Sequence, residues 1–83
     1  MFNNHIYKGV FFVTTGETIK AKRIERDITQ SELAEMIGVS KTYIYLIEND
    51  KKTPSLKMIL RISRVLRYSV DELIGSEEKL GLV

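Results

Sequence analysis

The chain has 83 residues with a formal net charge of +2, and 43% of its residues are hydrophobic and 29% charged. These values fit one small folded domain and exclude a disordered chain. It has no cysteine and a single histidine, so we expect no disulfide, no metal site and no cofactor. No apolar run reaches the roughly 20 residues that span a bilayer, and no leader pattern is visible at the start. We therefore expect a cytoplasmic protein without a membrane partner.

The N-terminal segment, residues 1–15, differs in character from the rest of the chain. Its run VFFVT is β-branched and aromatic without a helical period, which predicts a short strand. A first helix should then extend from about Thr15 to Arg26. Thr15 is the expected N-cap, and Ile19 and Ile24 mark the apolar side of this helix.

The next stretch, TQSELAEMIGVSKTYIYLIEN, predicts two short helices joined by a sharp bend. Thr29 and Glu32 form the expected capping box of the first of these helices, which should end at Gly38. Ser40 should cap the following helix, which extends to about Asn49. Five aliphatic side chains should hold the pair to the core: Leu33, Ile37, Val39, Ile44 and Ile47.

Two further helices are predicted after the polar loop NDKKT. One extends from about Ser55 to Leu66, and a short one follows Ser69 and closes at Gly75. Residues 54–68 contain cations but no acid, and three of these cations share one helix face: Lys57, Arg61 and Arg64. We interpret this stripe as a solvated face rather than a second binding surface.

Two short helices joined at a glycine are typical of a helix-turn-helix, whose second helix can enter the major groove of DNA. With IKAKRI before this unit and PSLKMILRISRVL and SVDELIG after it, the chain resembles the Cro and phage-repressor (XRE-like) helix-turn-helix family. The resemblance implies an all-α, five-helix, lambda-repressor-like domain over residues 16–75. A possible strand in residues 1–15 precedes this domain, and a tail of residues 76–83 follows it.

The resemblance also implies a function, namely sequence-specific binding of double-stranded DNA by a small homodimeric transcriptional repressor. Its third helix would read an inverted-repeat operator in the major groove. The DNA-binding positions that carry over are Gln30, Ser40, Lys41, Thr42, Tyr45, Leu46, Asn49, Lys51 and Lys52. Arg23 and Glu48 correspond to an ion pair that ties the first helix to the end of the third.

Some positions depart from the family pattern. Leu46 replaces a long polar residue and either contacts a thymine methyl or packs within the domain. Tyr45 replaces a residue that is frequently small and polar. Asp27 and Arg67 stand where glycine often ends a helix, which predicts backbone strain at both positions.

One function from another class competes with DNA binding, that of a protein-interaction adaptor or anti-repressor with the same fold. Such a protein should present apolar or acidic residues on its third helix, whereas this face is polar and basic. The sequence provides no catalytic set, so we do not expect an enzyme, and no small-molecule effector is expected.

Surplus apolar residues near both ends of the chain predict a homodimer built from the last helix. The N-terminal strand, the C-terminal tail or both would add to its interface. The strand either packs on its own core or pairs with its twin in the second subunit.

Overall fold

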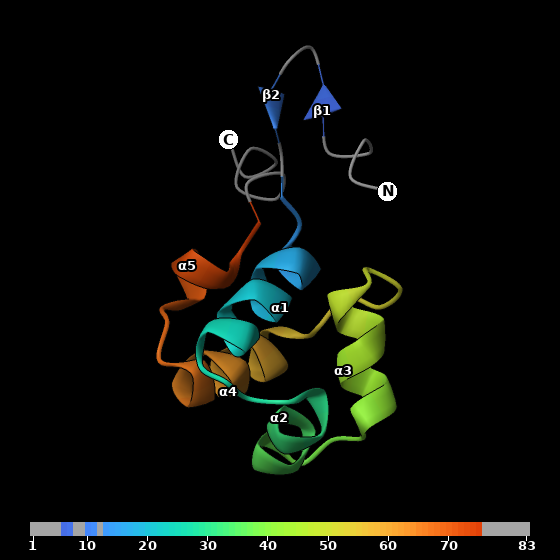
Figure 1. The fold of residues 1–83 in the computed structure, drawn as a ribbon, viewed down its shortest axis with the longest axis vertical. Helices are drawn as coiled ribbons and strands as arrows, with labels where there is room; N and C mark the ends of the chain where they lie inside the picture. Colours follow the sequence, from blue (N-terminus) through green and yellow to red (C-terminus); the bar gives the residue numbers. More distant parts are fainter. Residues whose placement is uncertain (1–5, 8–9, 12, 76–83) are drawn as a thin grey trace.

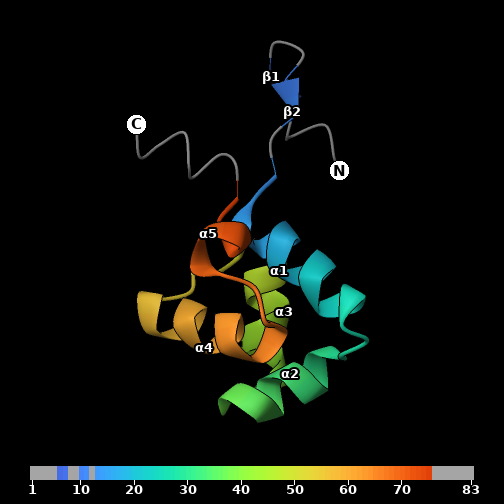
Figure 2. The same ribbon diagram turned by 90° about the vertical axis from the view of Figure 1, so that its left-hand side faces the viewer.

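The computed structural model describes residues 6–7, 10–11 and 13–75. In this part of the chain a two-stranded hairpin precedes five helices that pack around one core (Figures 1 and 2). The elements are β1 (Ile6–Tyr7), β2 (Val10–Phe11), α1 (Thr15–Glu25), α2 (Gln30–Ile37), α3 (Lys41–Glu48), α4 (Leu56–Leu66) and α5 (Val70–Leu73). The predicted all-helical domain is thus confirmed. Within the described residues, no helix is long and apolar enough to cross a membrane.

The extended segment forms more structure than the sequence indicated. β2 lies in the predicted VFFVT strand, and it pairs antiparallel with β1, a strand that the sequence analysis missed. The register places Ile6 opposite Phe11 and Tyr7 opposite Val10. The tail of residues 76–83 lies outside the described residues.

The core is almost entirely aliphatic, and all five helices contribute to it. Its buried hydrophobic residues are Ile19, Leu33, Ala34, Ile37, Ile44, Ile47, Ile59, Ile62, Leu66 and Leu73. Four of the five aliphatic residues predicted in the helix-turn-helix are among them, and Val39 packs against this core partly buried. Ile24 is 55% exposed, so its assignment to the apolar side of α1 was wrong.

The start of α1 also differs from the prediction. Thr14, not Thr15, is the N-cap, because its side chain accepts a hydrogen bond from the Glu17 amide while the Glu17 carboxylate accepts one from the Thr14 amide. Thr15 is buried instead, and its Oγ1 accepts a hydrogen bond from the Gly75 amide at 2.9 Å. Two adjacent threonines make the cap ambiguous in sequence, and the reciprocal partner Glu17 selects Thr14.

The bend between α2 and α3 forms as predicted. Thr29 and Glu32 make a capping box at the start of α2, and Gly38 ends the helix in the left-handed conformation with φ 76°. Ser40 then caps α3 by accepting a hydrogen bond from the Tyr43 amide. Because glycine reaches positive φ without a Cβ clash, the chain can turn sharply and begin α3 after only three residues, 38–40.

Among the described residues, three other than glycine also adopt positive φ, namely Asp27, Asp50 and Arg67. The predicted strain at Asp27 and Arg67 is therefore matched by their backbone conformation, whereas Asp50 was not anticipated. Arg67 ends α4 with φ 61°. A residue with a Cβ is less stable than glycine in this region.

Replacing Arg67 by glycine should therefore stabilise the domain. We expect Arg67→Gly to raise the free energy of unfolding by about 0.5–1 kcal/mol, since the left-handed conformation no longer strains a side chain. The matched control Arg64→Gly changes an exposed arginine within α4. This control should lower the free energy of unfolding by about 0.5–1 kcal/mol. Urea unfolding of both variants measures the two effects, and a loss of stability in Arg67→Gly would contradict the prediction.

Candidate nucleic-acid interface

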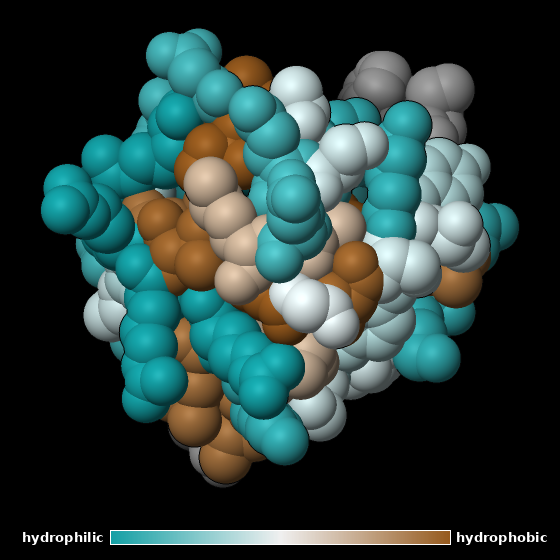
Figure 3. Space-filling view, turned by 90° about the horizontal axis from the view of Figure 1, so that it is seen from below, coloured by the Kyte–Doolittle hydropathy of each residue, from teal (hydrophilic) through white to brown (hydrophobic). Residues whose placement is uncertain are grey.

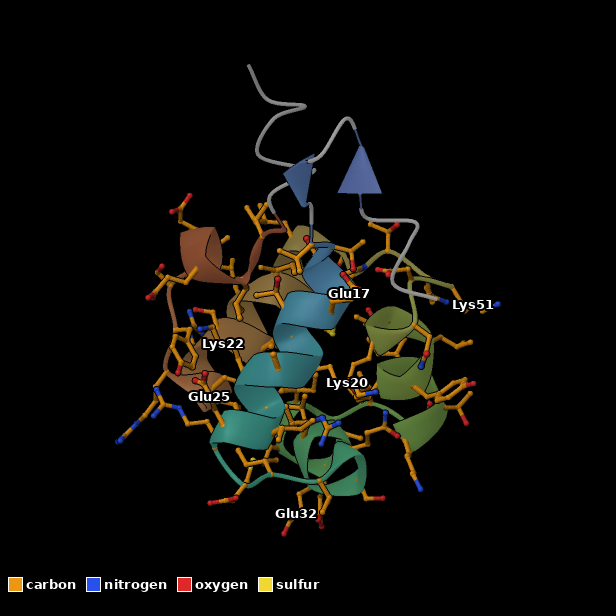
Figure 4. The ribbon with its side chains drawn as sticks, turned by 45° about the horizontal axis from the view of Figure 1, so that its top comes forward. Glu17, Lys20, Lys22, Glu25, Glu32 and Lys51 are labelled. Carbon is orange, nitrogen blue, oxygen red and sulfur yellow. The ribbon has the colours of Figure 1, made fainter. Side chains whose placement is uncertain are left out.

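The α3 helix lies at one edge of the molecule, with its outer face directed away from the other helices (Figures 1 and 4). Its inner face is buried through Ile44, Ile47 and Glu48. Four of the predicted DNA-binding residues lie at or near its start and outer side and are exposed: Ser40, Lys41, Thr42 and Tyr45. Leu46 is half-buried, which places it between the core and the outer face.

A buried ion pair ties the end of α3 to α1, as the resemblance implied. Arg23 Nε donates to Glu48 Oε2 at 2.6 Å, and Arg23 Nη2 donates to Glu48 Oε1 at 3.0 Å. Both residues are buried. The Nη1 atom of the same guanidinium donates to the Ile28 carbonyl at 2.7 Å, just before α2 begins. One planar group therefore links three segments of the helix-turn-helix region in a geometry that a lysine could not reproduce.

Gln30 extends this network toward the surface. It is the first residue of α2, and its Nε2 donates to Glu48 Oε1 at 2.9 Å. A carboxylate only accepts hydrogen bonds, so the amide nitrogen of Gln30 faces Glu48 and its Oε1 is turned away. The start of α2 and the end of α3 are thereby joined at the edge of the predicted DNA-binding surface.

The loop after α3 brings the remaining predicted residues to the same side. The Lys51 and Lys52 amides donate to the Leu46 carbonyl at 2.8 and 3.3 Å and so close the end of α3. The Lys51 side chain extends from the body in Figure 4, whereas Lys52 Nζ lies 5.6 Å from the centre of the Tyr43 ring. Asn49 donates its side-chain amide to the Tyr45 carbonyl at 2.9 Å.

Sequence analysis missed a further attachment of this loop. Thr14 Oγ1 donates to Asp50 Oδ2 at 2.8 Å, which connects the start of α1 to the residue that follows α3. Gly16 lies beside this contact, and a Cβ at that position would come within 2.2 Å of the Ile47 carbonyl oxygen. The close approach of α1 and α3 thus requires glycine, but nothing in the local sequence reveals that Thr14 and Asp50 meet.

The basic stripe on α4 lies elsewhere. Arg61 Nη1 donates to the Ile37 carbonyl at 3.2 Å, and Arg61 and Arg64 line an open hollow of about 410 Å³ against the end of α2. Met36 and Val65 form part of the same hollow. Figure 3 shows the surface on the α2 side, where apolar patches lie between hydrophilic side chains. The stripe therefore belongs to a different surface from the outer face of α3.

Comparison with known proteins places this geometry in a family. The profile of the HTH_3 family, described as helix-turn-helix, matches residues 19–73. The chain belongs to this XRE-type helix-turn-helix family. The family comprises DNA-binding transcription regulators, which are not a class of enzyme.

Relatives and solved structures agree with this assignment. The chain is 38% identical over 65 residues to the immunity repressor protein of Bacillus phage phi105, a match that covers 78% of this chain and 45% of that protein. Its structure resembles the regulator SinR in complex with DNA, with TM-score 0.69, 41% identity and coverage of 72% of this chain and 97% of that chain. It also resembles the P22 c2 repressor in complex with a synthetic operator, with TM-score 0.71 and 34% identity. This match covers 75% of this chain and 94% of the repressor chain.

The buried ion pair yields a stability prediction. Arg23→Met should lower the free energy of unfolding by about 3–5 kcal/mol, because it leaves the Glu48 carboxylate buried without its cation. The double variant Arg23→Met/Glu48→Leu should recover most of this loss, since neither charge remains. Denaturant unfolding of the wild type, both single variants and the double variant forms a complete cycle. A double variant as unstable as the sum of the single variants would show that the two residues act independently.

Proposed function

We propose that this chain is a transcriptional repressor that binds double-stranded DNA in a sequence-specific manner through α3. The observation that carries the proposal is the outer face of α3, which is exposed, polar and basic, while Glu48 on the same helix is bound to both Arg23 and Gln30. A helix held at a defined angle with free side chains is what base recognition in the major groove requires. The resemblance of this chain to SinR in complex with DNA and to the P22 c2 repressor in complex with a synthetic operator supports this proposal.

The proposed contacts divide into two kinds. Ser40, Lys41, Thr42, Tyr45 and Leu46 would face the groove, and among them Lys41 and Thr42 supply the donors and the acceptor best suited to base edges. Backbone phosphates would be bound at the two ends of the helix-turn-helix by Gln30, Asn49, Lys51 and Lys52. Phosphate contacts orient the protein, and base contacts determine which sequence it prefers.

The adaptor or anti-repressor alternative is less well supported by this surface. Tyr45 is 51% exposed and is the one large hydrophobic residue that the described part of α3 exposes. Its neighbours Lys41 and Thr42 are polar, and no acid lies in the first turn of α3. A protein-binding helix would be expected to present a continuous apolar surface.

Base contacts and phosphate contacts should separate by mutation. Lys41→Ala and Thr42→Ala should each relax discrimination at one or two base pairs by about 1–3 kcal/mol. Lys51→Ala, the matched control, should weaken binding to all sequences about equally and reduce the log–log salt slope by about 1. Selection of bound sites from a random duplex pool, followed by salt titration on the selected site, measures both effects. A uniform loss in all three variants would contradict the placement of α3 in the groove.

We further propose that the chain acts as a homodimer on an inverted repeat. The eight residues of α3 extend about 12 Å and can read only a few base pairs. A two-fold dimer would present two such helices about 34 Å apart, one turn of DNA. Doubling the number of base pairs read provides the information that one helix does not.

The end of the molecule where α1 begins and α5 ends supplies the proposed interface. The hairpin projects from this end and stands away from the helices (Figures 1 and 2). A two-stranded hairpin alone is marginally stable in water, and its outer edges favour a further strand. The segment after α5 packs closely against the segment that leads from the hairpin into α1. At Gly75 a Cβ would come within 2.3 Å of the Val13 carbonyl oxygen, so this contact requires glycine. In the proposed dimer, the hairpin and α5 of one subunit would pair with the same elements of the other subunit across a two-fold axis. This pairing would stabilise the hairpin and cover its edges.

The dimer can be tested by removing the hairpin. Sedimentation should show a dimer for the full chain at micromolar concentration and weaker association for a version that begins at Val13. If the truncated chain dimerises as strongly as the full chain, the interface is restricted to α5 and the tail. A full chain that stays monomeric both free and on an inverted-repeat duplex would refute the dimer.

A further inference from the structure

The last turn of α1 carries side chains toward two different parts of the molecule. Arg23 is directed to Glu48 at the end of α3, whereas Lys22 and Glu25 lie on the side that faces α4 and α5 (Figure 4). Arg26, the C-cap of α1, reaches the same side and donates to main-chain carbonyls at the end of α4. One turn of helix therefore touches both the recognition helix and the segment that leads into α5.

Arg26 binds the α4–α5 turn through its guanidinium. Its Nε donates to the Leu66 carbonyl at 2.7 Å, and its Nη2 donates to the Arg67 carbonyl at 3.2 Å. These carbonyls belong to the end of α4, where a helix leaves acceptors without partners in the helix itself. Arg26 thus stabilises the turn at the point where Arg67 adopts its left-handed conformation.

Tyr68, the next residue of the turn, is held by the same part of α1. Lys22 Nζ lies 4.4 Å and Arg26 Cζ 4.5 Å from the centre of its ring, both within the range of cation–π contacts. The Tyr68 hydroxyl donates to the Glu25 carboxylate. This hydrogen bond, together with partial burial, raises the pKa of Tyr68 above its ordinary value of 10.0. The hydroxyl therefore remains protonated and able to donate at neutral pH.

The α5 helix depends on such attachments because it is very short. It consists of Val70–Leu73, and Leu73 is its fully buried side chain. A helix of one turn does not hold its own orientation in water. Its far end is fixed by Leu73 in the core and by the Gly75 amide, which donates to Thr15 Oγ1, so loss of the contacts at Tyr68 would loosen the near end of α5.

We propose that Lys22, Glu25, Arg26 and Tyr68, named here the α1–α5 clamp, set the distance between half-sites that the dimer recognises. The inference rests on the proposed function, in which α3 reads DNA and α5 lies in the dimer interface. Arg23 and the α1 residues of the clamp occupy the same turn of α1. That turn would therefore set the angle between α3, which reads DNA, and α5, which lies in the dimer interface. Arg26 and Tyr68 would thus act as positioning residues, through their contacts between α1 and the segment that leads into α5.

The spacing of half-sites is a sensitive reporter of this angle. One inserted or deleted base pair moves a half-site by about 3.4 Å and rotates it by about 34°. A rigid dimer cannot follow such a change without losing contacts on one side. A dimer whose α5 is held less firmly can follow it, so loosening the clamp should broaden the range of accepted spacings while each half-site is still read.

The experiment compares binding of the full-length wild type and variants to duplexes with the preferred spacer and with one base pair more or less. The wild type should prefer its spacing at least about tenfold, since the contacts of one half-site are worth several factors of ten in affinity. In Arg26→Gln and Tyr68→Leu this preference should fall to about threefold or less, with binding to an isolated half-site within about twofold of wild type. Arg64→Gln, which changes an exposed arginine of α4 outside the clamp, should retain the preference.

The outcomes separate the clamp from the function on which it rests. A wild type that binds no inverted repeat as a dimer would refute the proposed dimer, and this inference with it. A wild type with a sharp preference that folded clamp variants retain would refute the clamp alone, as would equal broadening in Arg64→Gln. Should Tyr68→Leu unfold, Tyr68→Phe decides, because it keeps the ring between the cations and removes only the hydroxyl. That variant should show a smaller broadening, and an unchanged preference in both Tyr68→Phe and Arg26→Gln would refute the proposal.

Discussion

The bidentate contact between Arg23 and Glu48 ties α1 to the end of α3 inside this small domain. Aliphatic side chains such as Ile19 and Ile47 make the domain fold, but non-directional packing leaves the angle between short helices weakly specified. A guanidinium that binds Glu48 through two atoms and the Ile28 carbonyl through a third specifies that angle. Burying the pair has a desolvation cost that offsets much of its attraction. Its contribution is therefore better understood as orientation than as stability.

The α1 helix serves as the axis to which both ends of the domain are attached. Its first turn approaches α3 so closely at Gly16 that no side chain fits, and Thr14 binds the loop that follows α3. Its last turn holds α3 through Arg23 and the α4–α5 turn through Arg26. A helix of eleven residues can carry these contacts because successive side chains point in different directions at 100° intervals. The α3 helix and the end of the domain are thus both attached to one helix, α1.

The sequence predicted those features that local chemistry determines. Helix boundaries followed from capping residues such as Thr29 and Ser40, and the bend followed from Gly38. For Thr14 and Thr15 the prediction chose the wrong one of two adjacent threonines, although Glu17, the capping-box partner three residues after Thr14, is a local signal. The bond between Thr15 and Gly75 had no signal in sequence, because the two residues are 60 positions apart. The bond from Thr14 to Asp50 and the ring contacts of Tyr68 had no signal in sequence for the same reason. The Arg23–Glu48 pair was anticipated only through resemblance to a family, since 25 residues separate its members.

The division of α3 into a buried and an exposed face has a consequence for specificity. Its inward residues and Glu48 make the contacts that hold the domain, whereas the Lys41 and Thr42 side chains form no hydrogen bond or ion pair within the described part of the chain. If α3 reads DNA as proposed, substitutions on its outer face should change the preferred base pairs at little cost to folding, because surface changes of this kind usually alter stability by less than about 0.5 kcal/mol. Changes at Glu48 would instead alter the presentation of every outward side chain together. Under the proposed function, recognition and folding would be assigned to different residues of one eight-residue helix, and Gln30, bonded to Glu48 at the edge of that surface, is where the two would meet.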